Sequence, residues 1–207
     1  MRGKIYPYRG AVVLPFLILS LLLFLSLSGC SPADEGGEED FDGGHPDPLF
    51  VAVGITGTVL YSTDGNNWMN AGPISSQDLN GVTYWYGQFF AAGSNGKGFR
   101  SSTGGAGSWV DTSAPTPNTL WDITSGAGRL VAVGNVGTIG WSADGMGGSW
   151  TDSSIGGNDL FGIAYGNGRF VAVGMAGQVW WSADGSFGSW VNASPGGNDL
   201  YDICFRY

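Results

Sequence analysis

Leu130-Val-Ala-Val-Gly134 and Phe170-Val-Ala-Val-Gly174 are two copies of one apolar motif, and each is followed by Ser-Ala-Asp-Gly and then by a tryptophan. Weaker copies of the motif begin at Phe50 and Phe89, so it occurs four times between residues 49 and 207. The step from one copy to the next is about 40 residues, a period that is typical of solenoids and propellers. The repeat therefore predicts the fold class before any single residue is weighed.

The copy that begins at Leu160 shows most clearly what one repeat builds. Residues 160–165 and 169–174 are β-prone runs joined by Gly166-Asn-Gly168, a hairpin signal because these residues tolerate positive φ. Two further short runs follow between glycine-containing turns, at residues 178–182 and 189–192. Four short strands in about 40 residues are typical of one β-propeller blade. Because residues after 48 show no helical periodicity, we predict an all-β propeller of about four four-stranded blades.

The turn after the third strand of a repeat has the pattern Ser-x-Asp-Gly, and a tryptophan follows it. Three copies match it: Ser62, Asp64, Gly65 and Trp68; Ser142, Asp144, Gly145 and Trp150; Ser182, Asp184, Gly185 and Trp190. The second copy departs from it, with Thr103 in place of the aspartate. The pattern resembles the Asp box (BNR repeat) of sialidase-like and photosystem II assembly factor-like β-propellers, which implies structural residues. Ser and Asp can accept turn N–H groups, and Trp can fill the space between blades.

The phase of the repeat predicts how the propeller closes. Residues 49–50 align with the second strand of a repeat, whereas residues 200–205 align with a first strand. Together they would complete one blade, which predicts a ring closed by the C-terminal strand. Four blades is the low end of the known range. The alternatives are a piece of a longer array and an open arc that closes by oligomerisation, although an uncapped arc exposes apolar blade faces.

Residues 1–29 have the layout of a secretory signal, with three basic residues before an apolar run. Leu27-Ser-Gly-Cys30 resembles the lipobox of bacterial lipoproteins, in which the cysteine is acylated, for example with palmitate. The resemblance implies a membrane anchor through lipid on Cys30 in the cell envelope, and Ser31 after the cysteine implies the outer membrane. A transmembrane anchor is the alternative, because the run approaches the ~20 residues that a span needs.

Residues 30–48 predict a disordered acidic tether, since low apolar content with like charge buries too little surface to fold. His45, the only histidine of the chain, lies in this tether and is expected to be solvated. From residue 31 on, five basic residues stand against seventeen acidic ones. This composition excludes the clustered basic surface that nucleic-acid binding needs. Residues 49–207 are left as the propeller domain.

Residue types for catalysis are missing from residues 49–207. This range has no Glu and no His, so it lacks the Glu-backed tyrosine of a sialidase and any Cys-His pair. Arg129 and Arg169 hold equivalent positions in two repeats, which indicates a repeat-specific role. Because no metal-spaced Cys/His cluster or phosphate loop occurs, we predict no enzyme activity, no cofactor and no metal. Cys204 takes the place of Ala164 in the preceding repeat, which predicts a buried, inert thiol.

Two sets of aspartates are candidate binding residues. Asp78, Asp159 and Asp199 precede first strands, so in a ring their carboxylates would gather at one mouth of the channel. Asp122 and Asp202 lie within first strands and would face each other across a four-bladed ring. Facing carboxylates need a cation, a shared proton or a basic partner. The alternative is that all five cap turns and strand ends.

Trp85, Tyr86 and Trp121 are aromatic residues that could stack on sugars or peptides, or could fill the gaps between blades. Three hypotheses for function follow from these observations. The first is a non-enzymatic envelope lipoprotein whose propeller is a protein-interaction or assembly platform. The second is a surface carbohydrate-binding propeller, and the third is a degenerate sialidase-like glycosidase.

Overall fold

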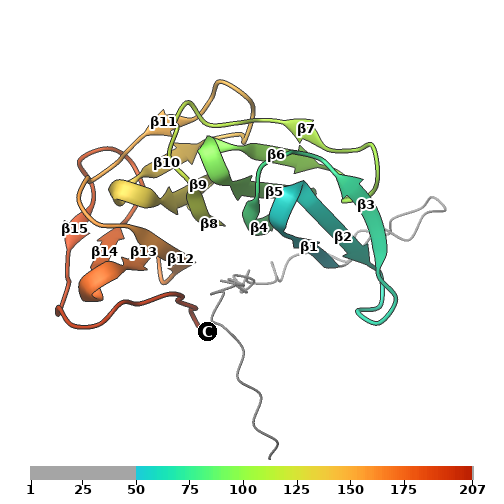
Figure 1. Ribbon diagram of the computed structural model, residues 1–207. Helices are drawn as coiled ribbons and strands as arrows, with labels where there is room; N and C mark the ends of the chain where they lie inside the picture. The colour runs from blue at the N-terminus through green and yellow to red at the C-terminus, as the bar shows by residue number, and fades with distance from the viewer. Residues whose placement is uncertain (1–49, 207) are drawn as a thin grey trace, which may run out of the picture.

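The computed structural model describes residues 50–206, which form antiparallel sheets, one for each repeat (Figure 1). The first sheet has β1 (Phe50–Val53), β2 (Thr58–Ser62) and β3 (Met69–Pro73). The second has β4 (Leu79–Trp85), β5 (Gln88–Gly93), β6 (Gly98–Ser101) and β7 (Val110–Asp111). The third has β8 (Leu120–Gly126), β9 (Arg129–Gly134), β10 (Ile139–Ser142) and β11 (Thr151–Asp152). The fourth has β12 (Leu160–Gly166), β13 (Arg169–Gly174), β14 (Val179–Ser182) and β15 (Val191–Asn192). These sheets confirm the predicted all-β architecture.

A short 3-10 turn joins the same two strands of each sheet: η1 (Ile55–Gly57), η2 (Ser94–Gly96), η3 (Asn135–Gly137) and η4 (Met175–Gly177). The middle residue of each turn has a positive φ, for example 52° at Thr56 and 58° at Val136. β-branched residues seldom adopt this conformation, so contacts from outside the turn are needed to hold it.

The four sheets follow one another along an open arc (Figure 1). The first strands of the second, third and fourth sheets, β4, β8 and β12, lie on the concave side, and we call them the inner strands. Within each sheet the strands pair in chain order and antiparallel, so every connection is a short hairpin. The inner strand of each repeat carries a register shift near its start, between Leu120 and Asp122 in the third sheet.

Apolar side chains pack between successive sheets and hold the arc together. Three clusters of buried residues fill the three spaces between neighbouring sheets. Leu130, Phe170 and Leu160 have no exposed surface, and each such side chain stabilises the fold by about 1.5–3 kcal/mol. In the second and third sheets the second strand is buried on both faces, because a neighbouring sheet covers each side.

The first sheet differs from the other three because it has three strands rather than the expected four. No described strand pairs with the edge of β1 that faces away from β2, and residues 200–206 form no strand. The predicted closure of the ring by the C-terminal strand is therefore not confirmed. Side chains of the first sheet are correspondingly open: Phe50 is 49% exposed, whereas the equivalent Phe170 is 0% exposed.

The predicted burial of Cys204 is wrong. Ala164, the equivalent residue in the fourth sheet, is buried, but the thiol of Cys204 is exposed. Ala164 pairs with Val171 of β13, whereas none of the described strands pairs with residues 200–206. Cys204 is exposed because no described second strand pairs with its segment, as β13 pairs with the segment of Ala164.

The predicted signal peptide, the lipidation at Cys30 and the acidic tether lie outside the described residues. Within residues 50–206, no helix has the length and apolar character required to cross a membrane.

Candidate interaction surface

The two ends of each sheet carry different turns. Consecutive hairpins lie at opposite ends of an antiparallel sheet, so the 3-10 turns lie at one end and the Ser-x-Asp-Gly turns at the other. The loops that lead into the inner strands reach the same end as the 3-10 turns, as the hydrogen bond from the Thr56 N–H to Asp78 shows. We call this end, with the 3-10 turns and the loops that precede Leu79, Leu120, Leu160 and Leu200, the turn face.

Asp78, Asp159 and Asp199 all lie on the turn face, one from each of three repeats. In each of them, Oδ1 accepts the N–H of the middle residue of the preceding 3-10 turn at 2.8 Å, from Thr56, Val136 and Ala176 respectively. These hydrogen bonds connect each turn to the next repeat and stabilise its positive φ. Within residues 50–206 no three acidic, His or Cys side chains are grouped in a way that could hold a metal ion. Ligand binding at these aspartates stays a prediction.

Exposed apolar side chains stand on the same face. Ile55, Val136 and Met175 lie in three of the 3-10 turns, and all three are exposed. The turn between them in the chain, η2, carries no apolar side chain, so three of the four 3-10 turns expose one to solvent.

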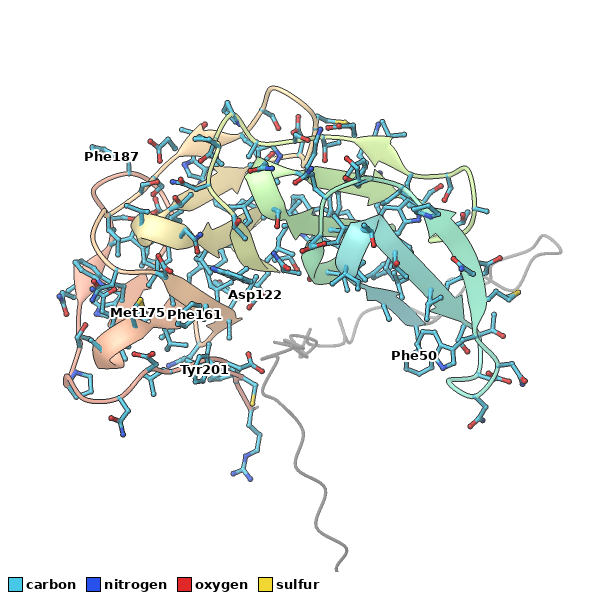
Figure 2. All side chains as sticks on the ribbon, in the orientation of Figure 1. Phe50, Asp122, Phe161, Met175, Phe187 and Tyr201 are labelled. Atoms are coloured by element: carbon cyan, nitrogen blue, oxygen red, sulfur yellow. The ribbon has the colours of Figure 1, made fainter. Side chains whose placement is uncertain are left out.

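An aromatic row runs beside the inner strands. Trp121, Phe161 and Tyr201 occupy one position of three successive repeats, directly after the leucine that begins the strand. The ring centroids of Trp121 and Phe161 are 6.2 Å apart, and those of Phe161 and Tyr201 are 5.4 Å apart in a stacked arrangement. Figure 2 shows Phe161 beside Tyr201, on the concave side of the arc.

Trp121 was the only member of this aromatic row that sequence reasoning selected. Its Nε1–H donates to Asn135 Oδ1 of η3 at 2.5 Å, so the row is attached to the turn face. Phe161 and Tyr201 were missed, although their common position after the leucine in each repeat was a signal that could have found them. Asn80 holds the same position in the second sheet and donates to the Leu120 carbonyl at 2.8 Å.

Asp122 lies between two inner strands rather than facing an open channel. Its side chain is 1% exposed; Oδ1 accepts the Ile123 N–H at 2.7 Å, and Oδ2 accepts the Ile163 N–H of β12 at 2.8 Å. Asp202 makes the equivalent bond to the Ile203 N–H at 2.7 Å, but its side chain is exposed. The two aspartates therefore hold the same position, and only Asp122 has a following strand to bind.

The Ser-x-Asp-Gly turns lie at the opposite end from the turn face. In the first sheet, Ser62 Oγ accepts the Gly65 N–H at 2.8 Å, while Asp64 Oδ1 accepts the Asn66 and Asn67 N–H groups at 2.8 Å. Donation first from Asn67 and then from Asn66 holds the pKa of Asp64 well below its ordinary range. The residues that follow the same pattern in the third and fourth sheets make matching bonds.

The other side chains considered from the sequence lie apart from the turn face. Trp85 packs against Phe90 with centroids 6.0 Å apart, and Tyr86 is exposed in the β4–β5 hairpin, at the opposite end of the sheet. Two arginines stack on tryptophans of their own sheets, Arg129 on Trp141 at 4.3 Å and Arg169 on Trp181 at 4.1 Å. They therefore do not converge on one substrate position.

No protein-family model matches the chain, and no curated protein matches it. Solved structures that resemble it include YCF48 bound to D1 peptide, with TM-score 0.58 and 19% identity over 75% of this chain and 53% of the other. The computationally designed Ika8 protein has TM-score 0.56 and 12% identity over 76% and 49%. The WD40 β-propeller domain of Doa1 has TM-score 0.57 and 10% identity over 73% and 52%. The chain thus spans about half the length of these structures, and the likeness shows that residues 50–206 have a β-propeller fold.

Proposed function

We propose that this protein is a non-enzymatic, membrane-anchored lipoprotein of the cell envelope and acts as a platform that binds a protein partner at the turn face. The observation that carries the proposal is that exposed apolar turn residues and the aromatic row lie together at the turn face. The propeller fold supports it, since YCF48 is bound to a peptide in its structure.

The chemistry of the turn face indicates the kind of partner. Asp78, Asp159 and Asp199 bring carboxylates close to the apolar turns, and each uses Oδ1 for its turn hydrogen bond. Residues 50–206 contain five basic and ten acidic residues, so the surface potential favours a basic ligand. We expect the partner to present an extended segment with apolar and basic side chains.

Affinity selection of a displayed peptide library on the full-length protein tests this proposal. Peptides that carry basic and apolar residues should be enriched. Val136→Asp or Met175→Asp should weaken their binding at least tenfold, about 1.4 kcal/mol, because a charge replaces an apolar contact. Phe187→Asp and Tyr86→Asp are matched controls, since both residues are exposed and aromatic but lie at the other end of the sheets. Equal losses for both pairs of variants, or no enriched peptides, would contradict the proposal.

Anchoring through Cys30 is the second part of the proposal and has its own test. The lipobox-like sequence supports it, because acylation of a cysteine with two or more chains gives stable membrane attachment. Cells that express the full-length protein should incorporate radiolabelled palmitate into it, and the labelled protein should be found in the outer-membrane fraction. Cys30→Ser should abolish labelling, and unchanged labelling would exclude this anchor.

Glycan binding is the second candidate function, and Tyr201 is the observation that favours it. Tyr201 is exposed and stacks on Phe161, so it presents an aromatic ring of the kind on which sugars stack. A glycan array probed with the full-length protein should then give signals that Tyr201→Ala removes. Signals that persist in this variant, or none at all, would favour the protein partner.

A further inference from the structure

We propose that two copies of this chain close into one ring, in which residues 200–206 of each copy pair with β1 of the other. The ring would bury the open edge of the first sheet and supply its fourth strand. This inference is independent of the proposed function, because it concerns the two ends of the arc and not the turn face.

Residues 200–206 already occupy the place of an inner strand. The Leu200 N–H donates to the Gly174 carbonyl at 3.0 Å, as the Leu79 N–H donates to the Gly54 carbonyl at 3.0 Å. An added Cβ at Gly166 would lie 2.1 Å from the Phe205 ring, and one at Gly126 would lie 2.1 Å from the Tyr165 ring. The segment therefore sits on β12 as β12 sits on β8, in the position of the first strand of a further blade.

Gly54 indicates that an inner strand belongs on the free edge of β1, the edge that faces away from β2. In the other sheets, an added Cβ at the equivalent glycine would lie 2.0 Å from the carbonyl oxygen that precedes the inner strand: Gly93 with Asp78, Gly134 with Thr119, and Gly174 with Asp159. Only glycine fits there. At Gly54, whose φ of −166° suits any residue, no other described residue comes within 4 Å of the added Cβ. Gly54 is thus a glycine at a position where only a paired inner strand would exclude a larger residue.

The face of the first sheet that is turned away from the second sheet has the residues that contact a preceding sheet in the other repeats. Trp68 is 44% exposed, whereas the equivalent Trp190 is 8% exposed and donates to Ser153 of the preceding sheet at 3.1 Å. An added Cβ at Gly185 would lie 2.8 Å from Val131 of the preceding sheet, but Gly65 meets only Phe50 of its own sheet. The residue equivalent to Val131 in the last sheet is Val171, so the fourth sheet of a second copy fits against Gly65.

The inner strands also alternate in a way that a second copy continues. Gly81, Asp122, Gly162 and Asp202 occupy one position in successive repeats. An added Cβ at Gly81 or Gly162 would lie 2.9 Å from the Cα of the next aspartate in the row. Asp122 accepts the Ile163 N–H of the following strand, so Asp202 would accept the equivalent Val82 N–H of a second copy. Gly81 of that copy would then follow Asp202, as Gly162 follows Asp122.

A second copy, rather than the same chain, is the occupant that the curvature favours. Figure 2 shows Phe50 and Tyr201 at separate ends of the open arc. The described arc matches 53% of the YCF48 chain and 52% of the chain of the Doa1 WD40 β-propeller domain, about half the length of each. The described residues supply one donor segment, residues 200–206, and one acceptor edge, at β1, and such head-to-tail contacts form a closed ring when the rotation matches.

The register of the exchange follows from the complete sheets. Leu79 pairs with Gly93 and Thr83 with Phe90, and Ala164 pairs with Val171. The same register places Leu200 opposite Gly54 and Cys204 opposite Val51 of the second copy. Cys204 is exposed in one chain, and this pairing would cover it.

Disulfide trapping in the full-length chain tests the exchange. Cys30→Ser leaves Cys204 as the only cysteine, since the chain has 2. V51C is then added, and the protein is oxidised in detergent with copper phenanthroline. The expected product is a covalent dimer on a non-reducing gel, because opposite residues of an antiparallel pair lie close enough for a disulfide. A52C is the matched control, since its side chain points to the other face, and it should give at least tenfold less dimer.

Four results would overturn the proposal. A monomer-sized product without free thiols would mean that the chain closes on itself, and a ladder of larger products would mean an open polymer. Equal cross-linking by V51C and A52C would mean random collision. Gly54→Ala in the V51C background should reduce the dimer at least tenfold, because its methyl group would meet the carbonyl of Asp199 in the partner. Undiminished dimer in this variant would place residues 200–206 elsewhere.

Discussion

Asp122 shows at the scale of one residue how a carboxylate that suggests a binding site can serve the fold instead. The sequence predicted it to be a binding residue within a first strand, facing Asp202 across a channel. It accepts the N–H of Ile123 in its own strand β8 and the N–H of Ile163 in β12, which is 41 residues away. No sequence pattern gives a hydrogen bond over that separation, because it depends on how the sheets pack.

Asp122→Ala should lower the free energy of unfolding by about 3 kcal/mol, because it leaves the buried Ile163 N–H without an acceptor. Asp122→Asn should cost less, since one oxygen remains to accept a hydrogen bond. Urea denaturation followed by tryptophan fluorescence measures both variants. If Asp122→Ala were as stable as the wild type, water or another group would have to replace the carboxylate.

At the scale of the element, the turns at the two ends of each sheet are built in different ways. The Ser-x-Asp-Gly turns use hydrogen bonds between residues two or three positions apart, so the pattern alone predicts which groups bind. The 3-10 turns need an aspartate from the next repeat, about 22 residues further on in the case of Thr56 and Asp78. For this reason the sequence suggested binding aspartates where the structure has connections between repeats.

Acid should destabilise the protein through the Ser-x-Asp-Gly turns. Turn N–H and hydroxyl groups lower the pKa of Asp64, Asp144 and Asp184 below the ordinary value of 3.8. A depressed pKa in the folded state contributes stability above the unfolded value, and this stability is lost as the pH falls through the folded value. The free energy of unfolding should thus be level above about pH 5 and should decline below about pH 4.

The replacement of all three aspartates by asparagine supplies the control for the acid experiment. This variant cannot titrate in the turns, so its urea midpoint should change less between about pH 5 and pH 3 than that of the wild type. The same decline in both proteins would assign the acid sensitivity to other carboxylates, such as Asp111 and Asp152, whose pKa values are also lowered.

At the scale of the whole molecule, the open arc decides which surfaces are covered. The inner faces of the second and third sheets are closed by neighbours, while Phe50 and Trp68 of the first sheet are exposed. Unpaired strand edges beside apolar surface invite association, and repeat proteins normally cover them. A ring of two chains would satisfy both ends at once, since each copy supplies the strand that the other lacks.

Thermal unfolding of such a ring should depend on protein concentration. Dissociation accompanies unfolding, so the Tm should rise by about 2–4 °C for each tenfold increase in concentration. Gly54→Ala should abolish the dependence, because its methyl group would meet the Asp199 carbonyl of a second copy. Within one chain no described residue comes within 4 Å of this methyl group, so the single chain should fold as before. Calorimetry at several concentrations measures both proteins, and a wild-type Tm that stays constant would indicate a stable single chain.

The blade, its strands and its turns could be predicted from the repeat alone. The repeat shows four times, at a period of about 40 residues, the same glycine turns and the same second strand with apolar residues on both faces. These are local properties of the sequence. The packing of the sheets sets the curvature of the arc, the exposure of Cys204 and the hydrogen-bond partners of the five candidate aspartates. Each of these depends on the angle and the contacts between neighbouring sheets. Those contacts join residues that are far apart in the chain, for example Thr56 with Asp78, 22 positions apart, and Ile163 with Asp122, 41 positions apart. For the same reason the aromatic row emerged only when equivalent positions of three repeats lay side by side.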